Sequence, residues 1–299
     1  MWVLVALAST VCYAGVSILD KYVLDRRLPS VVSFYAWVTI NHTVYVSILL
    51  AVTGIPWGGP GDKLLVAFLS GLSLGAGFVC MFLGLKLEEA SRAVALSQVY
   101  PIYVALLAVA FLGESLKPVQ WVAILLIVFG AMQISLRGGS GSMLPRLSRG
   151  LPFLLVTGIG QGVGFFLVKH AMEGLPVWTA LAFQQMGLLL AFGLFARPRA
   201  WRELAQVLRD RKFLLLMVSG ESALPFTAIA LTIWAVSLGP VSQVAALLAT
   251  RPLAVFAGSS ILSRERLGIL EESLSPTSLA LKGISIAMIV AGAATLGLY

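Results

Sequence analysis

The stretch VSQVAALLATRPLAVFAGSSIL, residues Val241–Leu262, decides the fold. It carries Arg251 in an otherwise apolar run. At ~1.5 Å per helical residue, Arg251 lies roughly 15 Å from the start of the stretch, near the centre of a ~30 Å hydrocarbon layer. A guanidinium is costly at that depth unless it has a partner or an aqueous cavity. Pro252 follows directly and removes a helical hydrogen bond, so the sequence predicts a broken membrane-spanning helix.

The same design occurs earlier in the chain, in residues 90–112, where Tyr100-Pro101 stands in place of Arg251-Pro252. In both copies a glutamate follows the proline thirteen residues later, and a leucine follows the glutamate two residues further on. The two sets are Pro101, Glu114 and Leu116, and Pro252, Glu265 and Leu267. This spacing predicts that the chain is internally duplicated, with two broken helices at its centre.

The composition indicates a membrane protein. Of the 299 residues, 59% are apolar and 11% are charged, whereas a soluble domain carries about 25% charged residues. The net charge of +8 does not predict a nucleic-acid partner, because the basic residues lie in short loops between apolar segments. Cys12 and Cys80 fall within apolar segments, where we expect buried thiols rather than a disulfide or a metal site.

Apolar segments long enough to form spans predict an all-α polytopic membrane protein with about ten transmembrane helices. They are residues 2–24, 30–53, 63–86, 91–112, 117–136, 150–172, 177–196, 213–238, 241–262 and 276–298. The expected units are a first five-helix repeat (1–137), a glycine-serine linker (138–149) and a second five-helix repeat (150–299). Because five is odd, the second repeat must be inserted upside down, which gives two inverted repeats.

Loop charges predict the orientation in the membrane. The loops after every odd-numbered expected helix hold seventeen lysines and arginines, and the opposite loops hold three. By the positive-inside rule, both termini face away from the cytoplasm in a cell (inner) membrane. Residues 197–212 place Trp201, Leu204 and Leu208 on one helical face, so we expect an interfacial amphipathic helix on the cytoplasmic surface.

The duplicated Pro-x12-Glu-x-Leu element, followed by Phe129-Gly-Ala in one half and Val290-Ala-Gly-Ala in the other, resembles the EamA-type repeat of the drug/metabolite transporter superfamily. The resemblance extends over nearly the whole chain, with its most specific part in residues 90–131. It implies a ten-helix carrier of small organic molecules that works by alternating access around a central cavity. It also implies cytoplasmic termini, from which the charge bias of this sequence departs.

Arg251 is the first candidate for substrate binding. Its planar guanidinium suits a carboxylate or phosphate, and the alternative is a structural salt bridge. Glu221 lies about eight residues, or roughly 12 Å, into its helix, at a depth near that of Arg251. The two side chains either neutralise each other permanently or exchange partners with a proton or a zwitterionic substrate.

Further candidates lie at matching depths in helices of both repeats. His42 is either a proton site or a hydrogen-bonding partner of a neighbouring helix. Trp234 is either an aromatic wall of the cavity or part of an interfacial belt. The other predicted substrate-binding residues are Tyr13, Trp37, Asn41, Tyr45, Gln98, Tyr100, Tyr103, Gln161, Gln184 and Gln185.

Other polar and small residues have structural interpretations. Glycines at 158, 160, 162 and 164 predict close helix packing, with a hinge as the alternative. Lys21 and Lys169 are expected to extend to the headgroups. Asp20 and Asp25 are expected to pair locally with Lys21, Arg26 or Arg27, and Glu114 and Glu265 each to cap the following helix.

The sequence shows no nucleotide-binding loop, metal cluster or nucleophile–His–acid set, so we expect no enzyme activity, cofactor or metal. The first hypothesis is a secondary active transporter of an amino acid or a related organic anion or zwitterion. The alternative is a flippase for a lipid-linked headgroup, with a cavity that opens sideways to the bilayer. The expected partners are the small-molecule substrate and membrane lipids. Protons and a second copy of the chain are further candidates.

Overall fold

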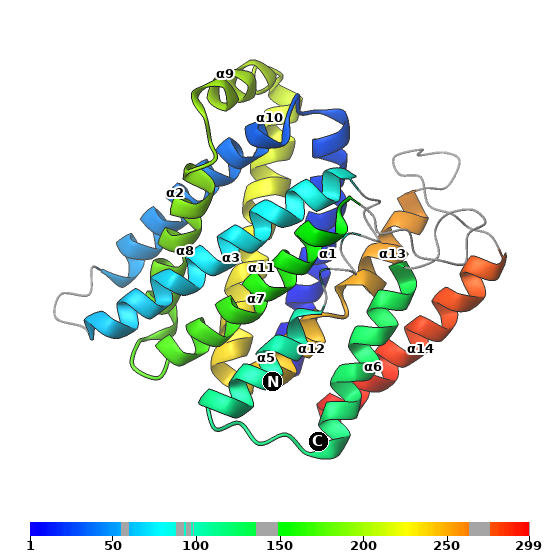
Figure 1. The fold of residues 1–299 in the computed structure, drawn as a ribbon. Helices are drawn as coiled ribbons and strands as arrows, with labels where there is room; N and C mark the ends of the chain where they lie inside the picture. Colours follow the sequence, from blue (N-terminus) through cyan, green and yellow to red (C-terminus); the bar gives the residue numbers. More distant parts are fainter. Residues whose placement is uncertain are drawn as a thin grey trace.

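The computed structural model describes residues 1–54, 60–87, 93, 97, 99–135, 149–262 and 276–298. Every regular element in these ranges is a helix (Figure 1). The first half holds α1 (Trp2–Arg26), α2 (Val31–Thr53), α3 (Gly61–Leu87), α5 (Tyr100–Phe111) and α6 (Pro118–Ser135). The second half holds α7 (Leu151–Ala171), α8 (Val177–Gly193), α9 (Pro198–Val207), α10 (Arg211–Val218), the π-helix η1 (Ser219–Ala223), α11 (Leu224–Leu238), α12 (Val241–Leu248), α13 (Arg251–Leu262) and α14 (Pro276–Leu298).

The polytopic all-α prediction is confirmed, because each apolar segment forms helix over most of its described residues. Among the described residues, five helical runs are long and apolar enough to cross a membrane alone: α1, α2, α3, α7 and the continuous run Arg211–Leu238. The number rises to six if α8 and α9, whose axes differ by 99°, are counted as one bent span. Where the structure describes the remaining expected spans, they are shorter apolar helices. Residues 138–148 of the expected linker and Glu265 lie outside the described residues.

The predicted helix break occurs before Pro252, whereas most of the segment before Pro101 lies outside the described residues. Arg251 begins α13 after a two-residue interruption that follows α12, and Pro252 is the second residue of α13. Pro101 is likewise the second residue of α5. A proline tolerates this position because the first N–H groups of a helix have no partner within the helix. The break therefore places Arg251 at a helix start in the interior of the bundle.

Contacts at the helix ends show that the two halves are inverted. Lys21, near the end of α1, donates to the carbonyl of Leu85 at the end of α3, so these helices run in parallel. Lys63, near the start of α3, contacts His170 at the end of α7. Since α7 is antiparallel to α3, it is also antiparallel to its counterpart α1.

Lys21 and Lys169 occupy equivalent positions in the two halves. Lys169 Nζ donates to the carbonyls of Val236 (2.8 Å) and Gly239 (3.0 Å) at the end of α11, as Lys21 does to Leu85 in α3. Both ammonium groups thus satisfy carbonyls that a helix end leaves without intrahelical partners. The expectation that they extend to the headgroups is wrong for this reason.

Small residues bring α3 and α7 into close contact, as the glycine pattern predicts (Figure 1). Gly160 and Gly164 face α3, where Ser73 and Ser70 donate to their carbonyls at 3.1 and 2.9 Å. The alternating Gly158 and Gly162 lie against α5 instead. The pair of helices related to α3 and α7 by the inverted symmetry is α11 and α1. There, Ser9 of α1 donates to the carbonyl of Ala228 of α11 at 2.8 Å.

Glu114, in the loop after α5, caps a helix of the other repeat. Its carboxylate accepts from the N–H of Val241 (2.7 Å) and from the hydroxyl of Ser242. These donors open α12, where a carboxylate is favoured by the unpaired N–H groups and the helix dipole. The prediction that Glu114 caps the following helix is wrong, because the helix start that its carboxylate reaches is that of α12 and not of α6.

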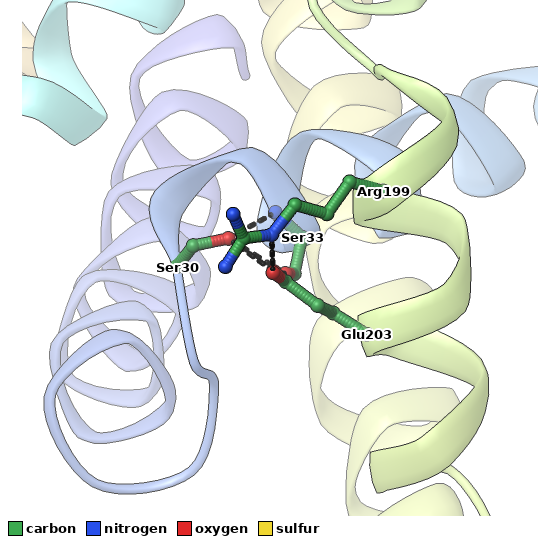
Figure 2. A network of polar contacts seen from close by, with 4 residues as sticks. All are labelled: Ser30, Ser33, Arg199 and Glu203. Atoms are coloured by element: carbon green, nitrogen blue, oxygen red, sulfur yellow. Dashed lines mark hydrogen bonds and ion pairs between the residues drawn. The ribbon is translucent and has the colours of Figure 1, made fainter.

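The helix α9 lies across one end of the bundle, and both chain ends lie at the opposite end (Figure 1). Figure 2 shows how α9 is tied to the start of α2: the Glu203 carboxylate accepts from the hydroxyls of Ser30 (2.7 Å) and Ser33 (2.6 Å) and pairs with Arg199 (2.7 Å). Leu204 packs into the core beneath. Trp201 is exposed, so the apolar face predicted for this segment is only partly buried.

Candidate functional site

A cavity lies at the centre of the bundle and takes residues from both repeats. The space within it that is open to water-sized molecules is about 130 Å³, which is room for a small organic molecule. Its walls are largely aromatic and aliphatic side chains of α2, α3, α8 and α11. The polar and charged lining residues are Tyr13, Asp20, Asn41, His42, Tyr45, Tyr100, Gln161, Gln184, Gln185, Glu221, Thr232 and Arg251.

Arg251 lines the cavity with its positive charge unmatched. The side chain is 8% exposed, and its Nε is buried without a hydrogen-bond partner. Across the described part of the chain it forms no ion pair, and its guanidinium carbon lies 5.7 Å from the centre of the Tyr13 ring. A cation–π contact of this kind stabilises a cation only partly. The guanidinium is therefore available to an anion in the cavity.

Glu221 meets Asp20 of α1 rather than Arg251. The two carboxyl groups lie within hydrogen-bonding reach of each other, and Glu221 and Asp20 are 3% and 6% exposed. The permanent Glu221–Arg251 salt bridge, one of the two alternatives from the sequence, does not form between these described side chains. The local pairing expected for Asp20 is also wrong, because Lys21 pairs with Asp25 at 3.0 Å.

The π-helix η1 positions Glu221. Its wider turn displaces backbone carbonyls from the α-helical pattern, and such turns are frequent at functional sites. Asn41 Nδ2 donates to the carbonyl of Glu221, and the Tyr45 hydroxyl donates to the carbonyl of Ser222. Ser222 in turn donates to Asn41 Oδ1 at 2.7 Å. Side chains of α2 thus hold the turn that carries the carboxyl.

Amide side chains line the wall formed by α7 and α8. Gln184 Nε2 donates to Ser70 Oγ at 2.8 Å, which anchors α8 to α3. Gln185 Oε1 lies 2.6 Å from His42 Nδ1, and the His42 ring stacks on Phe192 with centroids 5.7 Å apart. The Nε2 groups of Gln185 and Gln161 are buried and have no hydrogen-bond partner. These donors, like Arg251, are available to a ligand's oxygen atoms.

Most of the predicted residues line the cavity, and three lie away from it. Trp37 is buried in the apolar core between α2 and its neighbours. Tyr103 packs on Gly162, on the α7 face of α5. Trp234 is 42% exposed on the outer surface, as an interfacial-belt residue would be. Gln98 lies outside the described residues.

Asp20 and Thr232 line the cavity but were not predicted to do so. Asp20 follows Tyr13 by seven residues, a spacing that puts both side chains on one helical face. That spacing was the available signal, but the neighbouring lysine and arginines made a local ion pair the simpler interpretation. Thr232, an isolated hydroxyl in an apolar helix, gave no comparable signal.

Comparison with known proteins identifies the family. Residues 1–136 match the EamA-like transporter family. An uncharacterized transporter encoded in the cobO 3' region of a Sinorhizobium species is 34% identical over 93 residues, which are 30% of this chain and 66% of that protein. The uncharacterized transporter YwfM of Bacillus subtilis (strain 168) is 31% identical over 137 residues, which are 44% of this chain and 45% of that protein.

The fold of the whole chain has a counterpart among solved structures. One crystal structure superposes on 97% of this chain and 97% of its own chain, with a TM-score of 0.60 and 18% sequence identity. At this identity the likeness shows the fold alone. The family resemblance predicted from the Pro101–Glu114 element is confirmed by the match that includes it. Residues 1–136 are thus similar to the EamA-like transporter family, and the chain is a multi-pass membrane protein.

Proposed function

We propose that the protein is a secondary active transporter of a small organic anion or zwitterion, such as an amino acid or a related organic acid. The observation that carries this proposal is the set of unmatched donors in the cavity: Arg251 Nε, Gln161 Nε2 and Gln185 Nε2. A buried donor without a partner costs about 1–3 kcal/mol, and more when it is charged. The oxygen atoms of a carboxylate satisfy such donors and neutralise the guanidinium.

The rest of the cavity lining favours an organic molecule over an inorganic anion. The cavity is bounded largely by aromatic and aliphatic side chains, which suit the carbon skeleton of a metabolite. Glu221 Oε1 is a buried acceptor without a partner, and it suits a donor group on the same molecule. A ligand that carries both a carboxylate and a donor matches both kinds of group.

Alternating access is supported by a difference between equivalent helix pairs. α3 lies directly against α8, where Gly71 and Gly187 bring the two backbones together. The corresponding pair by the inverted symmetry is α2 and the η1–α11 run, where the long side chains of Asn41 and Tyr45 donate to carbonyls of η1. If α2 and α11 moved together while α3 and α8 moved apart, the two pairs would exchange their spacings. This exchange would expose Arg251 to each side of the membrane in turn.

Both termini are proposed to face away from the cytoplasm, with α9 on the cytoplasmic surface. The support from the described residues is the lysine and arginine at the α9 end of the bundle, namely Arg26, Arg27 and the six basic residues of 197–212. Labelling of single cysteines introduced at each terminus with a membrane-impermeant reagent tests this orientation, and labelling from the cytoplasmic side alone would overturn it.

The test is a counterflow screen in proteoliposomes loaded with amino acids, organic acids or phosphorylated metabolites. Arg251→Ala is expected to lower counterflow of the identified anion at least about tenfold, because a charge-assisted hydrogen bond is lost. Arg251→Lys keeps the charge without the planar fork and should retain part of the activity. Arg202→Ala, on the exposed face of α9, is the matched control and should leave counterflow unchanged.

Two results would contradict the proposal. One is counterflow by Arg251→Ala equal to that of the wild type. The other is translocation of a fluorescent phospholipid without counterflow of any of the small molecules, which would indicate the flippase.

A further inference from the structure

Two carboxyl groups from different repeats meet in the cavity, and their chemistry extends the proposed function, on which the following inference rests. Asp20 comes from α1 in the first repeat and Glu221 from η1 in the second. Both residues are more than nine-tenths buried, and both line the cavity. The contact between them therefore lies where the repeats must move relative to each other during alternating access.

A hydrogen bond between two carboxyl groups requires a proton. Two ionised carboxylates offer acceptors and no donor, so the neighbouring carboxyl groups of Asp20 and Glu221 can bond to each other only when one of them holds a proton. Two negative charges side by side in the interior would also repel each other strongly. Glu221 lines the cavity, and its Oε1 is buried without a hydrogen-bond partner.

The nearest cation does not take the place of this proton. Arg251 lines the same cavity, but it forms no ion pair with either carboxyl group in the described structure. Its unmatched guanidinium marks the cavity as a ligand site independently of the acidic pair. Anion at Arg251 and proton at Asp20–Glu221 can therefore be bound in the same cavity at separate positions.

The other titratable groups facing this space are engaged elsewhere or are weak acids. The Tyr45 hydroxyl donates to the carbonyl of Ser222, and the Tyr100 hydroxyl donates to the carbonyl of Ala245. His42 Nδ1 bonds to Gln185, and Tyr13 lies beneath the Arg251 guanidinium. Lys21, next to Asp20 in sequence, pairs with Asp25 and the carbonyl of Leu85. Among the described lining residues, Asp20 and Glu221 are thus the groups best suited to bind and release a proton.

We propose that Asp20 and Glu221 form one proton-binding site shared between the repeats, and that its proton is the ion coupled to transport. Proton binding joins the two carboxyl groups, and proton loss makes them repel each other across the contact between repeats. An anion at Arg251 adds a negative charge to the same cavity, so anion binding and proton binding are linked by their charges.

The first experiment uses the proton alone as the probe. Infrared difference spectra of the full-length protein in lipid should show a protonated carboxyl C=O band that titrates with pH. The band should disappear in Asp20→Asn/Glu221→Gln and shift in each single variant, because the remaining carboxyl loses its partner. Asp25→Asn is the matched control: it removes an exposed carboxylate of the same helix and should leave the band unchanged.

An identical band in the wild type and in the double variant would overturn the proton site. Each variant should elute from size-exclusion chromatography like the wild type, and the two single variants provide the result if the double variant does not fold. Because no substrate is added, this outcome is independent of whether the counterflow screen succeeds.

The second experiment measures coupling in proteoliposomes that enclose a pH-sensitive dye. The pool of amino acids and organic acids from the counterflow screen is added outside, and internal pH is followed during uptake. The expected result is a change in internal pH that accompanies uptake by the wild type and is lost in the single variants Asp20→Asn and Glu221→Gln. Uptake by the wild type without any change in internal pH would overturn the coupling role and leave the carrier function intact.

Discussion

Gly187 allows α8 to lie against the backbone of α3. A Cβ atom placed at this position would meet the carbonyl oxygen of Phe68 and lie 2.6 Å from the backbone nitrogen of Leu72. Gly71, on the other side of the same crossing, faces the carbonyl of Gln184 equally closely. Because backbone atoms cannot move aside as a flexible side chain can, a side chain at either position forces the helices apart.

We therefore expect Gly187→Ala to destabilise the protein by about 1–3 kcal/mol, the usual cost of overpacking a tight contact. The measurement is thermal unfolding of the detergent-solubilised protein. Gly193→Ala is the matched control on the same helix, since its nearest neighbour would be Thr39 Cγ2 at 3.9 Å. Equal melting temperatures for the two variants would show that the crossing is looser than described.

At the residue scale, the sequence shows how deep a side chain lies in the membrane but not which way it points. Arg251 and Glu221 were identified because each is a charge in an apolar segment, and their similar depth suggested a pair. Depth follows from counting residues at ~1.5 Å each, whereas the direction of a side chain depends on how each helix is rotated in the bundle. The partner of Glu221 therefore turned out to be Asp20, from the first helix of the other repeat.

At the element scale, α9 and α2 are joined by the carboxylate of Glu203, whose side chain is 17% exposed. Hydrogen bonds from the hydroxyls of Ser33 and Ser30 and from Arg199 lower the pKa of Glu203 from 4.5 to about 2. Ser30 also caps α2 by accepting from the N–H of Ser33 at 3.2 Å. The same carboxylate thus secures the start of α2 and the position of α9 (Figure 2).

The lowered pKa sets the pH range in which this network contributes to stability. A carboxyl whose pKa is lower in the folded state stabilises the fold above its unfolded pKa, and that contribution is lost as the pH falls through the folded value. The melting-temperature difference between the wild type and Glu203→Gln should stay constant above pH 4.5 and shrink as the pH falls toward about 2.

Ser30→Ala/Ser33→Ala is the matched variant for this prediction, since it removes the two hydroxyl donors and keeps the carboxylate. It should reduce the pH-dependent part of the difference. A stability difference for Glu203→Gln that persists undiminished at the lowest pH would show that the effect comes from packing.

The helix break at Pro252 could be predicted at the element scale, and the π-helix could not. Pro252 interrupts its helix through its own covalent geometry, so the position of this break can be read directly from the sequence. The turn η1 contains no such residue. It depends on hydrogen bonds from Asn41 and Tyr45, which come from the other repeat and become evident only in the folded protein.

At the scale of the whole molecule, the inverted duplication could be predicted because the repeated Pro-x12-Glu-x-Leu element and the odd helix number together require it. The contacts between repeats could not be predicted. Glu114 lies 127 positions before Val241, the first residue of the helix that it caps. A sequence shows that a carboxylate is available in a loop, but which helix start it reaches depends on how the two repeats pack together.

Two ion pairs join the repeats at opposite ends of the bundle. Arg27 and Asp210 lie 3.0 Å apart at the α9 end, where Arg27 also covers the ring of Phe213. Lys63 and Glu173 lie 3.2 Å apart at the other end. Exposed pairs of this kind contribute little to stability, so they can separate and form again during a transport cycle.

If the repeats rock against each other, a covalent tether at either end should stop transport. We expect counterflow to be abolished when a short reducible thiol cross-linker joins Arg27→Cys to Asp210→Cys, or Lys63→Cys to Glu173→Cys. The native Cys12 and Cys80 are first replaced by alanine, so that only the introduced thiols react. The single-cysteine variants treated with the same reagent control for its other effects, and reduction of the linker should restore transport. Full counterflow with both tethers in place would mean that the substrate crosses without relative movement of the repeats, and alternating access would have to be abandoned for this protein.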